Sequence, residues 1–367
     1  MDLALTLEDG TVTRVAKAKR VATYVPPPLL DVADFGAVAD NPAAMAANVE
    51  AFARAFSQAR LSGAHVIARK IYWLNKTIRQ DSITFHNEGA LWFDDGTTQV
   101  NAGLLMSGNA PKLNLTGSIN STATVRGGGA WGQHCVTVGG AVDFEIYGGG
   151  LVQGAACVGV FLQNAKRGLI RGIRARNTKA DNFHNTYGTE FVTWEDCAAE
   201  GGGDDMMAVV SYGKDGRAAD GTGGVICRDI TVRRFRGTNN KWGRGLSVVG
   251  GERITFEDST VSNVNGFGIY LASEGNTYNT RGVRNVTLRR VAVNVCGLYG
   301  LDLGDGLRVF GRSGLCSMGL PQTVEGVLLD GVTVTQPRRF AALVNTTYSK
   351  DIQRAGFTST APWRELA

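Results

Sequence analysis

Residues 180–211 read ADNFHNTYGTEFVTWEDCAAEGGGDDMMAVVS, and the fold of the whole chain can be worked out from this stretch. It holds two short strand-like runs, Asp181–Asn185 and Asp205–Val209, which begin 24 residues apart and each start with an aspartate. A third aspartate, Asp204, follows three glycines. The same short run recurs along the chain with other residues at the position of the first aspartate.

Two short patterns repeat from about residue 135 onward, and such repeats decide the architecture. Copies of the first pattern, X-Gly-apolar-x-apolar, are 23, 24, 39, 23 and 32 residues apart: 158–162, 181–185, 205–209, 244–248, 267–271 and 299–303. In the second pattern a polar or glycine pair separates two apolar residues, with spacings of 24, 38, 24, 32 and 41 residues: 170–173, 194–197, 232–235, 256–259, 288–291 and 329–332. Both patterns lengthen at the same places, so they belong to one coil with insertions.

A coil of 23–24 residues with several short strands predicts a parallel β-solenoid, in which strands of successive coils stack about 4.8 Å apart. The alternation of each strand places apolar residues such as Phe183 and Met207 inside, and the X and x positions outside. A leucine-rich horseshoe would need a helix and a Leu/Asn frame in every repeat, and these are missing. We therefore expect an all-β fold.

The sequence also predicts the ends of the solenoid. Residues 1–30 read as an extended lead-in, residues 31–345 as the solenoid, and residues 346–367 as a C-terminal tail. A capping α-helix is expected over about 42–62, because Asn41 is a good N-cap and Pro42 suits the first helical position. This helix would cover the open N-terminal edge of the sheets, which would otherwise promote aggregation.

Three insertions follow the X-Gly strand, near Gly213–Gly224, Gly275–Arg281 and Asp305–Thr323. They are expected to rise beside the same sheet, where they could wall a groove. Loops on a rigid sheet are where binding residues concentrate.

Polar residues gather at the outer positions of this sheet. The X position carries, in order, Val158, Asp181, Asp205, Arg244, Phe267 and Tyr299. The x position carries Phe161, His184, Ala208, Ser247, Tyr270 and Asp302. Acids and a base at the centre with aromatic rings at the margins are typical of a sugar site, because carboxylates transfer protons and flat rings stack on sugars.

The aspartate trio Asp181, Asp204 and Asp205 is the predicted catalytic group. Asp181 and Asp205 lie on adjacent coils, so their carboxylates should be close and one pKa should rise. Alternation points Asp204 elsewhere, and a separation of roughly 6.5–9.5 Å would leave room for a water, as in inverting glycoside hydrolysis. The predicted substrate-binding residues are His184, Arg244, Phe267, Tyr270, Glu274, Tyr299 and Asp302.

Less specific interpretations stay open for the same residues. Outward aspartates on a solenoid are often solvated or form a structural ladder. The rings of Phe267, Tyr270 and Tyr299 could instead form a patch for a partner. Trp194 falls at an inward position and is expected in the core, and Asn185, also inward, could belong to an asparagine ladder.

The composition narrows the function classes. The six cysteines form no CxxC pair and there are only four histidines, so neither a metal nor a cofactor is expected. A net charge of +5 is a weak bias, and nucleic acid is not an expected partner. The sequence has no apolar run of 18 residues and no recognisable signal peptide, so no membrane span is expected and the compartment stays open.

At its aspartates the chain resembles the polygalacturonase-like glycoside hydrolases of the pectin-lyase-fold superfamily. That family carries N-T-D, G-D-D, G-H-G and R-I-K along one sheet, and here Ala180-Asp181 and Gly203–Asp205 match the first two motifs. Gly243–Ser247 matches the third with arginine in place of histidine, and Tyr270–Ala272 lacks the basic pair of the fourth. Residues 34–38, DFGAV, are similar to the opening of many pectate-lyase-superfamily and phage tailspike β-helices.

The resemblance implies a right-handed parallel β-helix and a polysaccharide-degrading glycoside hydrolase with inverting chemistry. It implies that Asp204 is the general acid and that Asp181 and Asp205 hold the nucleophilic water. Because the histidine and the basic pair are missing, homogalacturonan is not the predicted substrate.

Two alternatives to a hydrolase remain. One is a polysaccharide lyase, epimerase or fructan-converting enzyme on the same fold, which could use His184, Arg244 or Tyr270. The other is a phage tailspike-type protein that binds glycan. In each case the expected partner is an oligo- or polysaccharide, and the chain is expected to be a monomer or a homotrimer.

Overall fold

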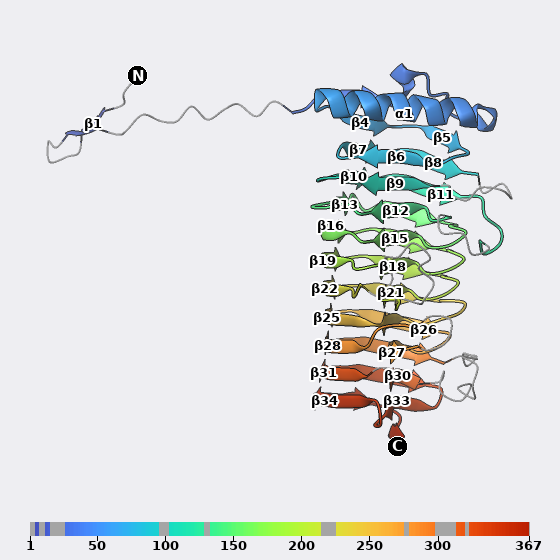
Figure 1. Cartoon of the computed structure of the whole chain (residues 1–367), viewed down its shortest axis with the longest axis vertical. Coiled ribbons are helices and arrows are strands. Elements are labelled where there is room, and N and C mark those ends of the chain that lie inside the picture. The colour runs from blue at the N-terminus through green and yellow to red at the C-terminus, as the bar shows by residue number, and fades with distance from the viewer. Residues whose placement is uncertain are drawn as a thin grey trace.

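The computed structural model describes residues 4–6, 12–14, 26–94, 103–127, 133–213, 225–274, 279–297, 313–319 and 323–366. Its strands stack in a tall column of coils with one α-helix across the N-terminal end (Figure 1). Each coil contributes one strand to each of three parallel sheets. The prediction of an all-β parallel β-helix is therefore confirmed. Separately, β1 (Ala4–Thr6) and β2 (Val12–Arg14) form an antiparallel pair.

Within the described residues the first sheet, sheet 1, has 12 strands. They are β3 (Leu29–Asp31), β4 (His65–Ala68), β7 (Thr84–Asn87), β10 (Lys112–Leu115), β13 (Glu145–Tyr147), β16 (Lys166–Arg171), β19 (Glu190–Glu195), β22 (Arg228–Arg233), β25 (Gly251–Glu257), β28 (Val283–Arg289), β31 (Val324–Asp330) and β34 (Ser349–Ala355).

Sheet 2 follows sheet 1 in each coil after a tight turn and has 11 described strands. They are β5 (Ile71–Leu74), β8 (Ala90–Phe93), β11 (Ser118–Ser121), β14 (Leu151–Gln153), β17 (Arg174–Arg176), β20 (Ala198–Glu200), β23 (Arg236–Thr238), β26 (Thr260–Val264), β29 (Ala292–Cys296), β32 (Thr333–Pro337) and β35 (Thr358–Ser359).

Sheet 3 completes the coil, also with 11 described strands. They are β6 (Ile78–Asp81), β9 (Leu104–Ser107), β12 (Val136–Gly139), β15 (Val160–Gln163), β18 (Phe183–Thr186), β21 (Met207–Val210), β24 (Leu246–Val249), β27 (Ile269–Ser273), β30 (Ser313–Gly319), β33 (Phe340–Asn345) and β36 (Trp363–Leu366).

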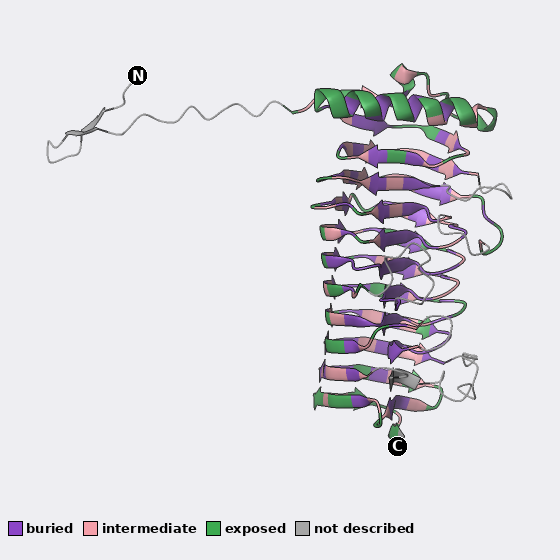
Figure 2. Cartoon of the chain, in the orientation of Figure 1, coloured by how far each residue is buried: buried purple, intermediate pink, exposed green. Residues whose placement is uncertain are grey.

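The N-terminal end of the column is closed by helical residues 42–62, as predicted. Two short 3₁₀ turns, η1 (Val32–Phe35) and η2 (Pro42–Ala44), precede α1 (Met45–Ser62). The Asn41 side chain accepts a hydrogen bond from the Ala43 amide at 2.9 Å, which caps the start of η2. Phe52 on α1 is fully buried and packs edge-on against Tyr72 and Phe85. The helix therefore covers the open end of the core, and its other face is exposed (Figure 2).

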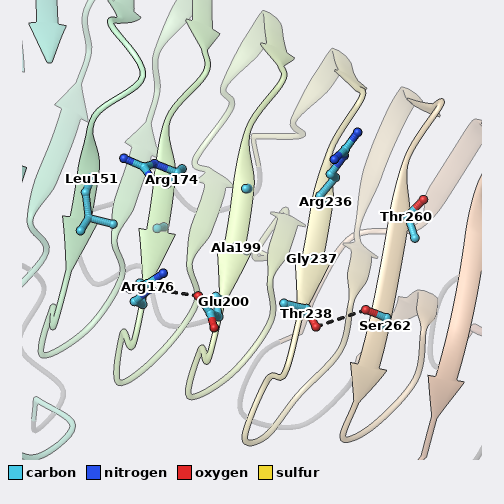
Figure 3. Close-up of a pocket in the computed structure, with 12 residues that line it drawn as sticks. Leu151, Arg174, Arg176, Ala199, Glu200, Arg236, Gly237, Thr238, Thr260 and Ser262 are labelled. Atoms are coloured by element: carbon cyan, nitrogen blue, oxygen red, sulfur yellow. Dashed lines mark hydrogen bonds and ion pairs between the residues drawn. The ribbon is translucent and has the colours of Figure 1, made fainter. Parts of the chain in front are cut away.

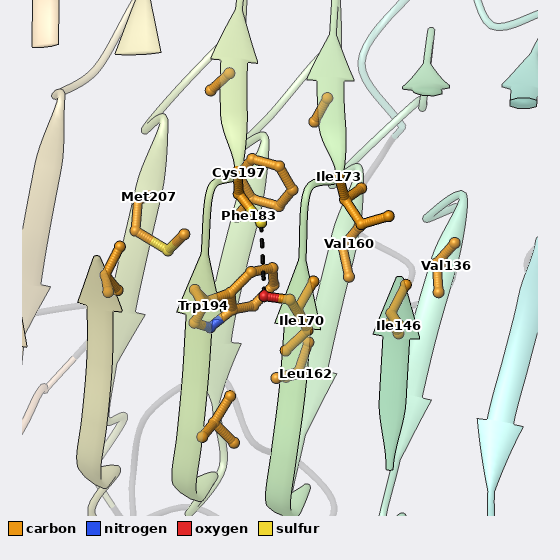
Figure 4. Close-up of a cluster of buried hydrophobic side chains, with 14 of the residues drawn as sticks. Val136, Ile146, Val160, Leu162, Ile170, Ile173, Phe183, Trp194, Cys197 and Met207 are labelled. Atoms are coloured by element: carbon orange, nitrogen blue, oxygen red, sulfur yellow. Dashed lines mark hydrogen bonds between the residues drawn. The ribbon is translucent and has the colours of Figure 1, made fainter. Parts of the chain in front are cut away.

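The core lies inside the coil and follows the predicted alternation. Phe183, Met207 and Val160 all point inward, and Figure 4 shows them packed with Trp194. Trp194 is fully buried, and its indole N–H donates to Asn185 Oδ1 at 2.9 Å. The register neighbours of Asn185 are Leu162 and Val209, so the alternative of an asparagine ladder in this column is wrong.

Two features differ from the expectation at the C-terminal end. The strand that pairs with β27 is β30, and Cys316 is the register partner of Tyr270, so the predicted coil position of 299–303 is wrong. Its candidates Tyr299 and Asp302 lie outside the described residues. Residues 349–366, expected to be a tail, contribute β34, β35 and β36 to the three sheets, so the coil continues to residue 366.

The predicted insertions fall mostly outside the described residues, which leave out 214–224, 275–278 and 298–312. In the part of the chain that the structure describes, no helix has the length and apolar character needed to cross a membrane.

Candidate active site

The aspartate trio lies where sheet 2 passes into sheet 3. Asp181 sits between β17 and β18, and Asp204 and Asp205 sit one coil further, between β20 and β21. The register pairs His184 with Ala208, which brings the two connections side by side. One carboxylate oxygen from each of the three aspartates lies within 4.8 Å of the others. The predicted convergence of these residues is therefore present.

Two glycines allow this close packing of connections. A Cβ atom on Gly203 would lie 2.3 Å from the carbonyl oxygen of Lys179. A Cβ atom on Gly243 would lie 2.6 Å from Asp204 Oδ1, and Gly243 also has φ +81°, which favours glycine. The chain needs glycine at both positions to let neighbouring coils approach the trio.

Asp181 is held by two protein donors. Its Oδ2 lies 2.5 Å from His184 Nδ1, and its Oδ1 accepts a hydrogen bond from the Asp205 amide at 2.9 Å. His184 is therefore a partner of the trio, and its Nε2 is buried without a hydrogen-bond partner among the described residues. A carboxylate offers about four acceptor sites, so Asp181 keeps acceptor capacity that the residues described in the structure do not use.

Asp205 is held more completely. Its Oδ1 accepts from the Arg244 amide at 2.8 Å, and its Oδ2 accepts from Ser247 Oγ at 2.6 Å and from Arg244 Nη1 at 3.3 Å. Burial raises the pKa of Asp205, and the charge of Asp181 raises it further. The positive charge of Arg244 and the hydrogen bonds from Ser247 and Arg244 act in the opposite direction. These contacts make Asp205 part of a buried ionic cluster.

Arg244 is the centre of that cluster. Its Nη2 donates to Glu274 Oε1 at 2.6 Å, and its guanidinium carbon lies 4.4 Å from the centroid of the Tyr270 ring. Burial alone would lower the pKa of Arg244, but the carboxylates of Asp205 and Glu274 hold it well above its usual value. Both terminal nitrogens of Arg244 are therefore engaged by carboxylates, and Arg244 links Asp205 to Glu274.

Asp204 differs from the other two acids. Its side chain is 20% exposed, and Oδ2 accepts from Arg126 Nη1 at 3.0 Å. Burial, followed by the charges of Asp181 and Asp205, raises the pKa of Asp204 to about 7, although Arg244 and Arg126 oppose the rise. A carboxyl group with such a pKa can carry a proton at neutral pH and release it.

Arg126 was not predicted from the sequence. It lies in the connection between β11 and β12, 78 residues before Asp204, and this connection belongs to neither repeated pattern. Its side chain is 52% exposed, so it is an accessible cation beside the acid. Neither the repeat spacing nor a local motif marks this residue.

The aromatic candidates are not open platforms. Phe267 is fully buried and Tyr270 is 4% exposed, and their rings stack on each other at 5.0 Å and 10°. His184, 6% exposed, lies in a second stack with Phe161 and His134. The expected role of Phe267 and Tyr270 as exposed sugar-stacking rings is therefore wrong, and Tyr270 packs against the Arg244 guanidinium group instead.

The spacing of the three carboxylates is also one that could hold a cation. Their oxygens, however, already have protein partners: His184 and the Asp205 amide for Asp181, Arg244 and Ser247 for Asp205, and Arg126 for Asp204. Two arginines thus offset part of the negative charge. The arrangement is suited to moving a proton at Asp204 next to two fixed carboxylates.

No protein-family model and no curated protein sequence matches the chain. Solved structures do. The chain is similar to the Agl-KA catalytic domain (TM-score 0.67, 16% identity, covering 94% of this chain and 60% of that one). It is similar to the family 28 exopolygalacturonase of Yersinia enterocolitica (TM-score 0.58, 12% identity, covering 100% of this chain and 82% of that one). It is also similar to the endo-xylogalacturonan hydrolase of Aspergillus tubingensis (TM-score 0.60, 15% identity, covering 92% of this chain and 95% of that one).

These likenesses confirm the parallel β-helix fold that the resemblance implied. At 12–16% identity they establish the fold alone. The chain spans about 60% of the length of the Agl-KA catalytic domain.

Proposed function

We propose that the protein is a polysaccharide-degrading glycoside hydrolase in which Asp204 is the general acid. The observation that carries the proposal is the asymmetry of the trio: Asp204 has a pKa raised to about 7 and a partly exposed carboxyl group, whereas Asp205 is enclosed by donors. The difference in exposure and in protein donors favours Asp204 as the group that gives up a proton and leaves Asp205 as a fixed ionic partner. Neighbours with the same fold carry the names of glycoside hydrolases.

The nucleophile in this proposal is water. Asp181 retains acceptor sites beyond its bonds to His184 and the Asp205 amide, so it can take a proton from a water. That water attacks the anomeric carbon as Asp204 gives its proton to the departing glycosidic oxygen and the C–O bond breaks. The sequence pattern predicts that Asp181 and Asp205 activate the water together. The contacts favour Asp181 as the base: the Asp205 amide donates a hydrogen bond to Asp181, and the Asp205 carboxylate is bonded to Arg244.

The spacing of the carboxyl groups bears on the stereochemistry. The nearest oxygens are within 4.8 Å, closer than the roughly 6.5–9.5 Å that was expected and that is usual for inverting enzymes. A covalent route would need an accessible carboxylate as nucleophile. Asp205 is 3% exposed and Asp181 is 9% exposed, and both are bonded to protein donors, so we propose inversion in spite of the short spacing.

The experiment is a polysaccharide panel with product analysis by proton NMR. We expect new reducing ends, with the first-formed product in the anomeric configuration opposite to that of the cleaved bond. A first-formed product of the same configuration would overturn inversion while leaving hydrolysis intact. Unsaturated, ultraviolet-absorbing products would show a lyase, and glycan binding with no product would show a tailspike-type binding protein; either would overturn the proposed function.

A further inference from the structure

A hollow lies away from the aspartates, on the outer face of sheet 2. It has a volume of about 520 Å³ and is lined by residues of β14, β17, β20, β23 and β26 (Figure 3). Because five parallel strands lie about 4.8 Å apart, the hollow extends for roughly 19 Å along the column. None of the three aspartates lines it.

A small residue between two long ones shapes this hollow. The register places Arg174, Ala198 and Arg236 side by side on three successive strands. The two arginine side chains therefore rise from strands roughly 9.6 Å apart, with only a methyl group between them. The space between the guanidinium groups is open to a ligand, and both arginines are exposed.

The charge of the hollow is unbalanced. Its ionisable lining residues are Arg174, Arg176, Arg236 and Glu200. Glu200 is paired with Arg176 at 2.9 Å. Arg174 and Arg236 form no ion pair with any residue in the described ranges. Two free guanidinium groups on one face favour a ligand with negative charges, because planar guanidinium groups bind carboxylate and sulfate oxygens with paired hydrogen bonds.

The neutral lining indicates what kind of polyanion fits. Thr260 lies beside Arg236 in the register, and Thr238 lies beside Ser262, whose Oγ is 3.2 Å from Thr238 Oγ1. These hydroxyl groups can exchange hydrogen bonds with the hydroxyl groups of a sugar. No aromatic residue among the described residues lines the hollow, whereas proteins that bind single-stranded nucleic acid stack its bases on aromatic rings.

The hollow also lies close to the trio along the chain. Strand β20 ends at Glu200, four residues before Asp204, a length of chain that can span at most about 14 Å. Two residues after β23, the Asn240 side chain donates to the Asp204 carbonyl oxygen at 3.3 Å. One polymer chain could therefore contact both places.

We propose that this hollow is an auxiliary binding site for an anionic polysaccharide, one that carries carboxylate or sulfate groups. Arg174 and Arg236 bind the anionic groups, and Thr238, Thr260 and Ser262 bind sugar hydroxyls. Binding here does not depend on the proposed hydrolysis, so the site stands even if the trio has another role.

The test is calorimetric titration of the whole chain carrying Asp204→Asn, which removes turnover during the measurement. The probes are oligogalacturonate for carboxylate, dextran sulfate for sulfate, and neutral dextran. We expect binding of at least one anionic probe, and an affinity about tenfold lower when Arg174→Ala and Arg236→Ala are added. Higher salt should weaken the binding, because the contacts are exposed.

The matched control carries Arg171→Ala and Arg284→Ala, two exposed arginines of sheet 1, so that net charge falls by the same amount. This control should bind like the parent, and circular dichroism should show both variants folded. Equal loss of affinity in the two variants would mean nonspecific charge attraction and would overturn the site. Unchanged binding after Arg174→Ala and Arg236→Ala would also overturn the site. The same holds if a single-stranded oligonucleotide binds as tightly as the anionic glycan and loses its affinity when these two arginines are replaced.

Discussion

Replacement of Asp204 by asparagine is expected to lower polysaccharide turnover by about 10²–10⁴-fold, the usual contribution of a general acid. Asparagine has nearly the shape of aspartic acid but no proton to give to the leaving oxygen. The side chain can still accept a hydrogen bond from Arg126, which now bonds Oδ2 at 3.0 Å, so the local structure should survive. The measurement is the rate of reducing-end release, with thermal unfolding recorded for both proteins.

The matched control is Asp196→Asn. Asp196 is an exposed aspartate at the corner after β19, where it pairs with Arg234 at 2.7 Å, outside the candidate site. The Asp196→Asn substitution should leave polysaccharide turnover unchanged. If Asp204→Asn kept the full rate while remaining folded, the role given to Asp204 would be wrong.

The second large effect concerns stability. Substitution of Arg244 by methionine is expected to lower the free energy of unfolding by about 3–5 kcal/mol, the range seen when one partner of a buried ion pair is removed. The change would leave Asp205 and Glu274 without their shared cation, and the Arg244 side chain is only 13% exposed. Urea denaturation should show the loss, and hydrogen exchange should locate it in the coils from β21 to β27.

Arg289→Met provides the comparison for this variant. Arg289 also bridges two acids, Glu257 at 3.8 Å and Asp330 at 3.1 Å, but its side chain is 40% exposed. Solvent screens exposed pairs, so this loss should be much smaller. Equal losses for the two variants would show that burial does not set the strength of the Arg244 cluster.

The convergence of the aspartates could be predicted because it follows from the number of residues in one coil. Asp181 and Asp205 are separated by one coil without an insertion, so the same strand position recurs and the register is determined. The same method failed after Tyr270. There the chain carries extra residues before β30. The motif at 299–303 predicts the next strand of sheet 3, but that strand is formed by residues 313–319.

Burial on the outer side of sheet 3 could not be predicted from alternation. A period of two separates the inside of a coil from its outside, but it does not tell what covers the outside. Phe267 and Ser247 lie at outward positions and are nevertheless fully buried. Arg126 escaped prediction for a related reason, since it reaches Asp204 from a connection that does not repeat.

The central claim is that Asp204 holds a proton which burial and two neighbouring carboxylates keep in place and which Arg126 helps to release. The most direct measurement is the pH dependence of kcat/KM for the native protein and for Arg126→Ala, because this ratio reports the ionisation of the free enzyme. An acid is active only when protonated, so activity should fall as pH rises through about 7. Loss of the Arg126 cation should raise the pKa of Asp204 and move that limb to higher pH. A limb near pH 4, the usual range of an aspartate, or one that Arg126→Ala leaves in place, would contradict the account.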